Sequence, residues 1–424
     1  MTKPHIHVSG VGGVGMNAVA QLLLTKGFRV TGSDRFYDQG VSLPVLNQLT
    51  ALGLELFPQD GNILSPATQA LVISTAVEAD NAERVRATEL EIPERHRAEV
   101  LADACAGRPL AAVAGTSGKT TCTGWLGWVL TECGLDPTMV NGGGITQWKD
   151  DRTPGNVRLG AEDAWWVMEV DESDRSLLNF YPKVALINTI SEDHHSLDDT
   201  IALFRDFASQ VSDCIVCGPG VATYLKGTGR ELKEVTEPLD VPLPGDHNAW
   251  NAAAVLEMAK VCGVSEEEAL PSVKSFPGVE RRLELCSSQG QGPRVYDDYA
   301  HNPEKLLAAI RAVRPEDGRC VVLWRPHGFA PLKQNFNAYV RTFCEGLRSK
   351  DELLLLPVFY AGGTAPKGVG SRELGAALKQ AGVQVQVLSG YPDTVRLAWE
   401  DVLLVAGARD PALPAFARRI GSQG

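Results

Sequence analysis

The feature that most limits how this chain can fold is a glycine-rich turn between an apolar run and an amphipathic stretch. Residues 110–114 read Leu-Ala-Ala-Val-Ala, the turn follows as Gly-Thr-Ser-Gly, and Lys119-Thr120-Thr121 opens the amphipathic stretch. A buried strand, a glycine turn and a helix start place backbone N–H groups and a partial positive charge around a phosphate group. We therefore expect an ATP site, with Lys119 at the outer phosphates and the Thr120 hydroxyl available to Mg²⁺.

This turn departs from the usual phosphate-binding loop, whose first glycine is replaced here by Val113. The alternative interpretation is a plain glycine turn followed by a surface lysine. The strand–turn–helix context favours the phosphate site, because each of its three parts contributes to the cradle.

Length and charge restrict the class of protein. A chain of 424 residues is natural for two or three domains, and 44% hydrophobic with 22% charged residues is a globular composition. The net charge of −12 argues against a general partner of nucleic acids or anionic membranes. A local site for a nucleotide can still be positive on an acidic chain.

The sequence also indicates a compartment. No apolar run approaches the roughly 20 residues needed to span a bilayer, and the N-terminus enters a strand at once, which leaves no room for a signal peptide. The nine cysteines are scattered and odd in number, which fits reduced thiols in the cytoplasm. We interpret the pair Cys214 and Cys217 as core residues of a strand.

Strand-like and helix-like segments alternate along the chain, which predicts an α/β fold with mostly parallel sheets. We expect three domains. They are a Rossmann-like domain over residues 1–107, a central P-loop-type ATPase domain over 108–288, and a C-terminal Rossmann-like α/β domain over 289–424. Strands are predicted in the last block at 294–298, 320–324, 352–357 and 402–406, with helices at 303–313, 334–347 and 371–381.

The first block opens with a second glycine cluster. A strand leads into Gly10-Val-Gly-Gly-Val-Gly15, a helix follows, and the next strand ends at Ser33-Asp34. A glycine turn, a helix and an acidic residue about 20 residues on are typical of a Rossmann nucleotide site. A nicotinamide-dependent oxidoreductase would explain this cluster, but it would leave the ATP loop unexplained.

Acidic and histidine residues follow strands of the central block. Glu169 ends one apolar run, and His194 follows the next. In open α/β sheets ligands bind at the carboxyl ends of the strands, so both side chains are expected near Lys119 and Thr120. A carboxylate and a hydroxyl suit Mg²⁺, and a neutral imidazole could hold a second ion.

Six segments in chain order are similar to motifs of the Mur ligase family, the ATP-dependent amide-forming enzymes of peptidoglycan assembly. The resemblance covers nearly the whole chain and is closest to the branch that joins L-alanine to UDP-N-acetylmuramate. The six segments are residues 115–121, 169–174, 192–194, 244–251, 278–282 and 297–303.

The resemblance implies a reaction and its partners. The first domain would bind a UDP-sugar, the second ATP with Mg²⁺, and the third would bring an amino acid or short peptide and close over the site. The sugar carboxylate would attack the γ-phosphate of ATP, and the amine would then displace phosphate from the acyl phosphate. The protein would be a monomer or a homodimer, without nucleic acid or membrane insertion.

The resemblance also implies roles for individual residues. It implies catalytic roles for Lys119, Glu169, His194 and Arg282. It implies metal binding by Thr120, Glu169 and His194. ATP contacts fall to Gly115, Thr116, Ser117, Gly118, Lys119, Thr120, Thr121, His247, Asn248, Asn251, Arg282, Asp298 and His301. UDP-sugar contacts fall to Gly10, Gly12, Gly13, Val14, Gly15, Ser33 and Asp34.

Two positions depart from the alanine-adding branch and leave the acceptor open. That branch has histidine where this chain has Ser117, and its Pro-His-Arg segment reads Pro-His-Gly here, with Gly328 in place of the arginine. Arg325, His327 and Lys333 are the candidates for the amino-acid site. A ligase that recycles murein peptides and a Mur-like ligase with another acceptor therefore stay as alternatives, as does a non-catalytic nucleotide-binding regulator.

Overall fold

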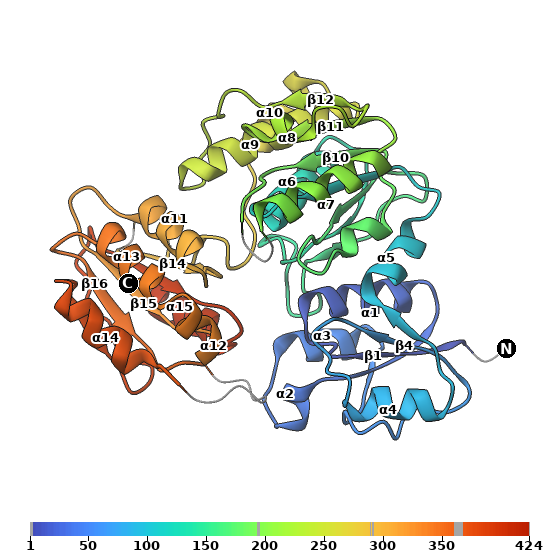
Figure 1. The fold of residues 1–424 in the computed structure, drawn as a ribbon, viewed down its shortest axis with the longest axis horizontal. Helices are drawn as coiled ribbons and strands as arrows, with labels where there is room; N and C mark the ends of the chain where they lie inside the picture. The colour runs from blue at the N-terminus through green and yellow to red at the C-terminus, as the bar shows by residue number, and fades with distance from the viewer. Residues whose placement is uncertain (1–2, 193–195, 289, 291, 360–367, 424) are drawn as a thin grey trace. The chain divides into compact units, whose positions relative to one another are not determined.

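The structure is a computed structural model that describes residues 3–192, 196–288, 290, 292–359 and 368–423. Helices and strands alternate along these residues and build three mostly parallel sheets, which confirms the predicted α/β class (Figure 1). The chain divides into two compact units. The first contains residues up to Val241 together with Ala249–Pro277, and the second contains Pro242–Asn248 and the residues from Gly278 onward.

The first sheet is parallel and has the strand order β3-β2-β1-β4-β5. Its strands are β1 (His5–Ser9), β2 (Arg29–Ser33), β3 (Glu55–Leu56), β4 (Thr68–Ile73) and β5 (Glu94–His96). Its helices are α1 (Val14–Thr25), α2 (Arg35–Asp38), α3 (Pro44–Ala51), α4 (Ala82–Glu89) and α5 (Arg97–Cys105). The strand order reverses beside β1, and ligands of open sheets bind at such a reversal, at the carboxyl ends of the strands. The first glycine cluster follows β1 and so lies at this position.

Strand β1 is buried along its length although it contains two histidines. His5 Nε2 and His7 Nδ1 lie 2.8 and 2.7 Å from the Thr31 hydroxyl, and His7 Nε2 lies 2.7 Å from a carboxylate oxygen of Glu83. Because both rings are hydrogen-bonded, the strand tolerates imidazoles where an apolar side chain is usual.

The second sheet has the order β12-β11-β10-β6-β9-β7-β8 and is parallel except for the β7–β8 pair. Its strands are β6 (Leu110–Ala114), β7 (Thr138–Val140), β8 (Val157–Arg158), β9 (Trp166–Glu169), β10 (Val184–Ile187), β11 (Cys214–Cys217) and β12 (Glu231–Glu234). The associated helices are α6 (Lys119–Glu132), η1 (Ser176–Asn179), α7 (Leu197–Gln210), α8 (Val221–Leu225), α9 (Asp246–Val261) and α10 (Glu266–Lys274). Cys214 and Cys217 are buried free thiols in β11, which confirms their interpretation as core residues.

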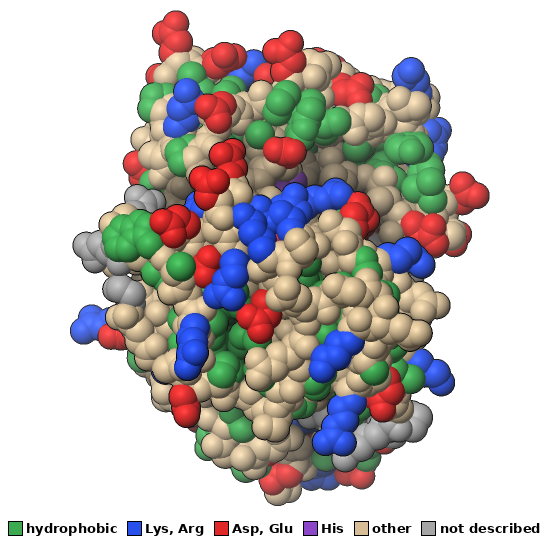
Figure 2. Space-filling model, turned by 90° about the vertical axis from the view of Figure 1, so that its left-hand side faces the viewer, with side chains coloured by type: hydrophobic (Ala, Val, Ile, Leu, Met, Phe, Trp, Pro, Cys, Tyr) green, Lys and Arg blue, Asp and Glu red, His purple; other side chains and the backbone are tan. Residues whose placement is uncertain are grey.

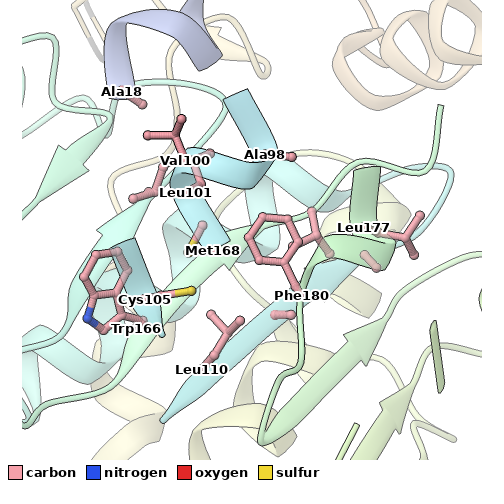
Figure 3. Close-up of a cluster of buried hydrophobic side chains, with 14 of the residues drawn as sticks. Ala18, Ala98, Val100, Leu101, Cys105, Leu110, Trp166, Met168, Leu177 and Phe180 are labelled. Carbon is pink, nitrogen blue, oxygen red and sulfur yellow. The ribbon is translucent and has the colours of Figure 1, made fainter. Parts of the chain in front are cut away.

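One hydrophobic cluster connects the first sheet's helices to the second sheet within the first unit (Figure 3). Ala18 of α1 and Val100 of α5 belong to it, as do Leu110 of β6, Trp166 of β9 and Phe180. Burial of apolar side chains stabilises by roughly 25 cal/mol per Å². Helix α5 is therefore held firmly against the sheet that carries the phosphate loop.

The third sheet has the order β13-β14-β18-β15-β16-β17, with only β13 antiparallel to its neighbour among the described strands. Its strands are β13 (Glu284–Leu285), β14 (Arg294–Asp298), β15 (Cys320–Trp324), β16 (Glu352–Leu355), β17 (Val385–Val387) and β18 (Val402–Ala406). Its helices are α11 (Pro303–Val313), α12 (Phe329–Gln334), α13 (Phe336–Gly346), α14 (Ser371–Gln380) and α15 (Ala412–Gly421). The helix predicted over 334–347 is confirmed as α13, which begins two residues later because the backbone leaves helical geometry at Asn335 and separates α12 from α13.

The surface charge is uneven despite the net charge of −12. Lys and Arg side chains gather together on the face drawn in Figure 2. An acidic chain can therefore present a locally positive surface to an anion. Across the described residues, we find no helix with both the length and the apolar character of a membrane span.

Candidate active site

The phosphate loop has the predicted geometry, running from the end of β6 into the first turn of α6. Gly115 and Gly118 have φ angles of +133° and +84°, which residues with a Cβ atom rarely adopt. A Cβ atom at Gly115 would also lie 2.9 Å from the backbone nitrogen of Thr189. Glycine is therefore required at position 115 by both backbone conformation and packing.

Side chains and backbone groups at the end of β10 hold this loop in place. The Thr116 hydroxyl lies 3.0 Å from the Thr189 hydroxyl and 2.8 Å from the Ser191 hydroxyl. The Ser117 amide donates to Thr189 Oγ1 at 2.7 Å, and Asn188 Nδ2 donates to the Ser117 carbonyl at 3.2 Å. These hydrogen bonds fix the conformation of the loop.

Lys119 is the first residue of α6, and its ammonium lies within the loop. It donates to the two carboxylate oxygens of Glu172 at 2.9 and 2.7 Å and to the Gly115 carbonyl at 2.9 Å. Burial acts to lower the pKa of Lys119, but the negative charges of Glu172, Asp171 and Glu169 outweigh it and raise the pKa overall. Lys119 is thus a charged group that Glu172 and the Gly115 carbonyl hold within the loop.

Thr120 and Glu169 come together as predicted. The Thr120 hydroxyl donates to Glu169 Oε1 at 3.1 Å, and the Gly142 amide donates to Glu169 Oε2 at 2.8 Å. A hydroxyl and a carboxylate oxygen side by side are hard oxygen donors, which fit Mg²⁺. The third predicted ligand, His194, lies outside the described residues.

The glycine cluster after β1 is held open by Asp34. Its carboxylate accepts the amides of Gly12 and Phe36, each at 2.9 Å, so this acid fixes the turn and caps α2. Gly13 is the N-cap of α1 and offers no side-chain cap, and the first turn contains no acidic residue. Within the described residues, the N-terminus of α1 therefore has no side-chain cap, an arrangement that suits an anion. Ser33 is buried beside this turn, at the end of β2.

An arginine that the sequence did not single out joins the two glycine loops. Arg97, the first residue of α5, lies 3.2 Å from an Asp171 carboxylate oxygen and 3.5 Å from one of Asp174. On its other side the guanidinium lies against Gly15, where an added Cβ atom would overlap Nη1. Asp171 directly precedes Glu172, the partner of Lys119. Since Arg97 lies outside both glycine motifs in the sequence, neither motif points to it.

The start of α9 contributes Asn251 to the phosphate loop. Its Oδ1 accepts from Asn188 Nδ2 at 2.9 Å, and a Cβ atom at Gly118 would lie 2.9 Å from it. The other two residues assigned to the nucleotide, His247 and Asn248, belong to the second unit. Asn248 donates to the Pro244 carbonyl at 2.8 Å.

In the second unit, Asp298 ends β14 as a buried acid. Its carboxylate accepts the amides of Leu283 and Ala300 at 2.8 and 2.7 Å. Burial raises the pKa of Asp298, while the charge of Arg282 and the two amides oppose that shift. The Arg282 guanidinium also lies 5.4 Å from the centre of the Tyr299 ring. Asp298 is therefore a fixed part of the segment that leads to His301.

The three candidates for the amino-acid site have different surroundings. His327 lies beside His301, with ring centres 5.0 Å apart. Arg325 forms an ion pair with Asp410 and is committed to the fold. Lys333 is exposed on α12.

Comparison with known proteins identifies the family. The protein-family model described as "Mur ligase family, catalytic domain" matches residues 5–108 of the sequence. A second family model, described as "Mur ligase, glutamate ligase domain", matches residues 281–409. The UDP-N-acetylmuramate–L-alanine ligase of Synechococcus sp. (strain JA-3-3Ab) is 30% identical over 467 residues, covering 99% of this chain and 88% of the relative. The chain belongs to the Mur ligase family.

Further relatives and solved structures agree with this assignment. The UDP-N-acetylmuramate–L-alanine ligase of Rhizobium meliloti is 31% identical, over 89% of this chain and 87% of the relative. The fold of this Mur ligase matches the UDP-N-acetylmuramate-alanine ligase of Thermotoga maritima with a TM-score of 0.81 at 23% identity, covering 99% and 98% of the two chains. It matches a murein peptide ligase from Psychrobacter arcticus with a TM-score of 0.70 at 20% identity, over 99% and 98%.

The predicted residues of this Mur ligase fall into three groups in the structure. Lys119, Thr120 and Glu169 lie together at the carboxyl ends of β6 and β9, with Asn251 at the same loop. The cluster after β1 forms a separate cradle that Arg97 connects to them. Arg282, Asp298, His301 and His327 are gathered in the second unit.

Proposed function

We propose that this chain is an ATP-dependent ligase that joins the carboxylate of UDP-N-acetylmuramate to an amino acid, with L-alanine as the first candidate. The observation that carries the proposal is the placement of Thr120 and Glu169 as a paired hydroxyl and carboxylate beside the Lys119 ammonium. A plain nucleotide-binding regulator has no need of that arrangement. The names of the relatives supply the substrate class.

The proposed reaction has two steps, formation of an acyl phosphate and attack on it by the amine. A carboxylate oxygen of the sugar nucleotide forms a bond to the γ-phosphorus of ATP, the bond to the bridging oxygen of ADP breaks, and an acyl phosphate results. The acceptor's amine nitrogen then bonds to the acyl carbon. Phosphate leaves with the former carboxylate oxygen, and the nitrogen loses a proton.

The chain's own groups stabilise charge in the first step. The Lys119 ammonium faces the β- and γ-phosphates once it leaves Glu172, and the loop amides surround the same oxygens. Thr120 and Glu169 would hold Mg²⁺, which neutralises phosphate charge when bound. The amides of α1 and the Arg97 guanidinium form the cradle that we assign to the UDP-sugar diphosphate.

A peptide-recycling ligase is the second candidate, because Gly328 replaces the arginine of the Pro-His-Arg segment that is typical of the alanine-adding branch.

A panel assay of phosphate release separates these candidates. The protein is incubated with ATP, Mg²⁺ and UDP-N-acetylmuramate, together with each of the twenty amino acids or with a murein tripeptide. Release that requires both the sugar nucleotide and one amino acid supports the first candidate. Release with the tripeptide alone favours recycling, and release with none of these acceptors refutes both.

A further inference from the structure

Three neighbouring parallel strands of the third sheet end together and bring distant residues to one edge. Asp298 of β14 and Trp324 of β15 are both in register with Ala406 of β18, which lies between them. The segments that follow these strands are 299–301, 325–327 and 407–409. The amide of residue 325 donates to the Ala406 carbonyl at 3.1 Å, and the amide of residue 407 donates to the Asp298 carbonyl at 3.1 Å, so the three segments stay adjacent beyond the strands.

Two neutral histidines form part of this edge. The rings of His301 and His327 cross at 81° with their centres 5.0 Å apart. His301 Nδ1 lies 3.0 Å from the Tyr299 carbonyl, which can only accept, so Nδ1 carries the hydrogen and Nε2 is left as an acceptor. Burial, followed by the charges of Lys305, His327 and Arg282, lowers the pKa of His301 to about 4. His301 is therefore uncharged near neutral pH.

Arg409 supplies an uncommitted positive charge to the same edge. It is exposed, and within the part of the chain that the structure describes its guanidinium makes no hydrogen bond or ion pair. Burial together with the Arg409 charge lowers the pKa of His327 to about 4. The neighbouring Asp410 does not neutralise Arg409, because its carboxylate already binds Arg325, the Tyr391 hydroxyl and the amide of residue 412.

The backbone at Arg409 has a strained conformation. Its φ angle is +66°, a left-handed conformation that is uncommon for residues other than glycine, asparagine and aspartate. Such strain is concentrated at functional sites, where it fixes the direction of a side chain. A glycine would satisfy this backbone, yet the chain has an arginine.

The other basic candidates fit an anion less well. Arg325 also donates to the Pro357 carbonyl at 3.2 Å and lies between the rings of Phe359 and Tyr391, at 5.1 and 5.7 Å from their centres. Its guanidinium is therefore surrounded by protein groups.

We propose that Arg409 binds the carboxylate of the acceptor, whether a free amino acid or a peptide, with His301 and His327 forming the wall of that site. The proposal rests on the ligase function proposed above. An arginine offers paired N–H donors that match the two oxygens of a carboxylate. Arg409 thereby takes the carboxylate-binding role for which the sequence had offered three candidates, Arg325, His327 and Lys333.

The test compares an acceptor with its own carboxamide, which removes the negative charge and keeps the amine. Arg409→Gln should lower kcat/KM about 10- to 100-fold for the acid, the range expected for one hydrogen-bonded charged group, and leave kcat/KM for the carboxamide and KM for ATP unchanged. The preference of the enzyme for acid over carboxamide should collapse. An unchanged preference would overturn the proposal.

Two variants separate binding from folding. Arg409→Gly suits the left-handed backbone, so its melting temperature should match or exceed that of the unaltered protein while its preference for the acid is lost. Arg341→Gln, which removes another exposed arginine on α13, should keep the preference. A lower melting temperature together with an intact preference in Arg409→Gly would assign Arg409 a structural role and overturn the proposal.

The design also distinguishes this proposal from the one on which it rests. Both the best amino acid from the panel and the murein tripeptide are used as acceptors, each with its carboxamide. If the unaltered protein forms no amide with any acceptor, the ligase function and the Arg409 assignment both fail. If the unaltered protein forms an amide and the Arg409 variants keep its preference for acid over carboxamide, the Arg409 assignment alone fails.

Discussion

Replacing Lys119 with methionine should lower the free energy of unfolding as well as abolish turnover. The substitution keeps the aliphatic stem but removes the ammonium, and it leaves the Glu172 carboxylate without its partner. The two side chains are only 15% and 5% exposed, so this is a buried ion pair. Removing one member of such a pair costs about 3–5 kcal/mol, and the partial exposure of Lys119 places the expected loss near the lower end, about 3 kcal/mol.

A double-mutant cycle measures the coupling between the two groups. Urea denaturation of Lys119→Met, Glu172→Gln and the double variant should show that the double variant loses about 2 kcal/mol less than the sum of the single changes. The exposed pair Arg29–Glu55, at 44% and 46% exposure, serves as the control, and its coupling should stay below about 1 kcal/mol. Additive losses for Lys119 and Glu172 would refute the ion pair as an energetic unit.

Three further predictions follow from the site. Gly142→Ala should raise the Mg²⁺ concentration for half-maximal phosphate release about 10-fold or more, because its methyl group displaces the Glu169 carboxylate; an unchanged titration would remove Glu169 from the metal site. Arg97→Gln should raise KM for the UDP-sugar about 10-fold and spare KM for the acceptor, as measured by initial rates. His301 and His327 have folded-state pKa values of about 4, below the usual 6.5, so their contribution to stability is lost as pH falls through that range. Between pH 7 and pH 5, the melting temperature should therefore fall less for the double variant His301→Gln/His327→Gln than for the unaltered protein.

Local patterns predicted the parts of the fold that are set by short-range physics. The strands at 294–298, 320–324 and 402–406 have the predicted bounds, and the last two are continuous apolar runs. Strand β17, with three residues at the sheet edge, is too short to give a periodic signal, and the sequence did not predict it. Helix α15 was also missed, although its apolar residues recur with helical spacing.

The same distinction holds for the site. Lys119 and Thr120 were predictable because one strand, turn and helix fix them, and Glu169 because it ends the neighbouring strand. Helix packing brings Arg97 to its partners, and sheet register brings Arg409 to the edge that carries the two histidines; no local motif records either. The structure adds that the Asp34 carboxylate accepts the amides of Gly12 and Phe36, and its contact with the UDP-sugar stays a prediction.

The central claim is that a carboxylate is activated by transfer of a phosphoryl group from ATP. The direct measurement is to label both carboxylate oxygens of UDP-N-acetylmuramate with ¹⁸O and to analyse the phosphate released with the best acceptor by mass spectrometry. The acyl-phosphate route predicts one ¹⁸O atom in each phosphate and one in the amide product. Phosphate without ¹⁸O would mean that water attacks ATP, and it would contradict the proposed function.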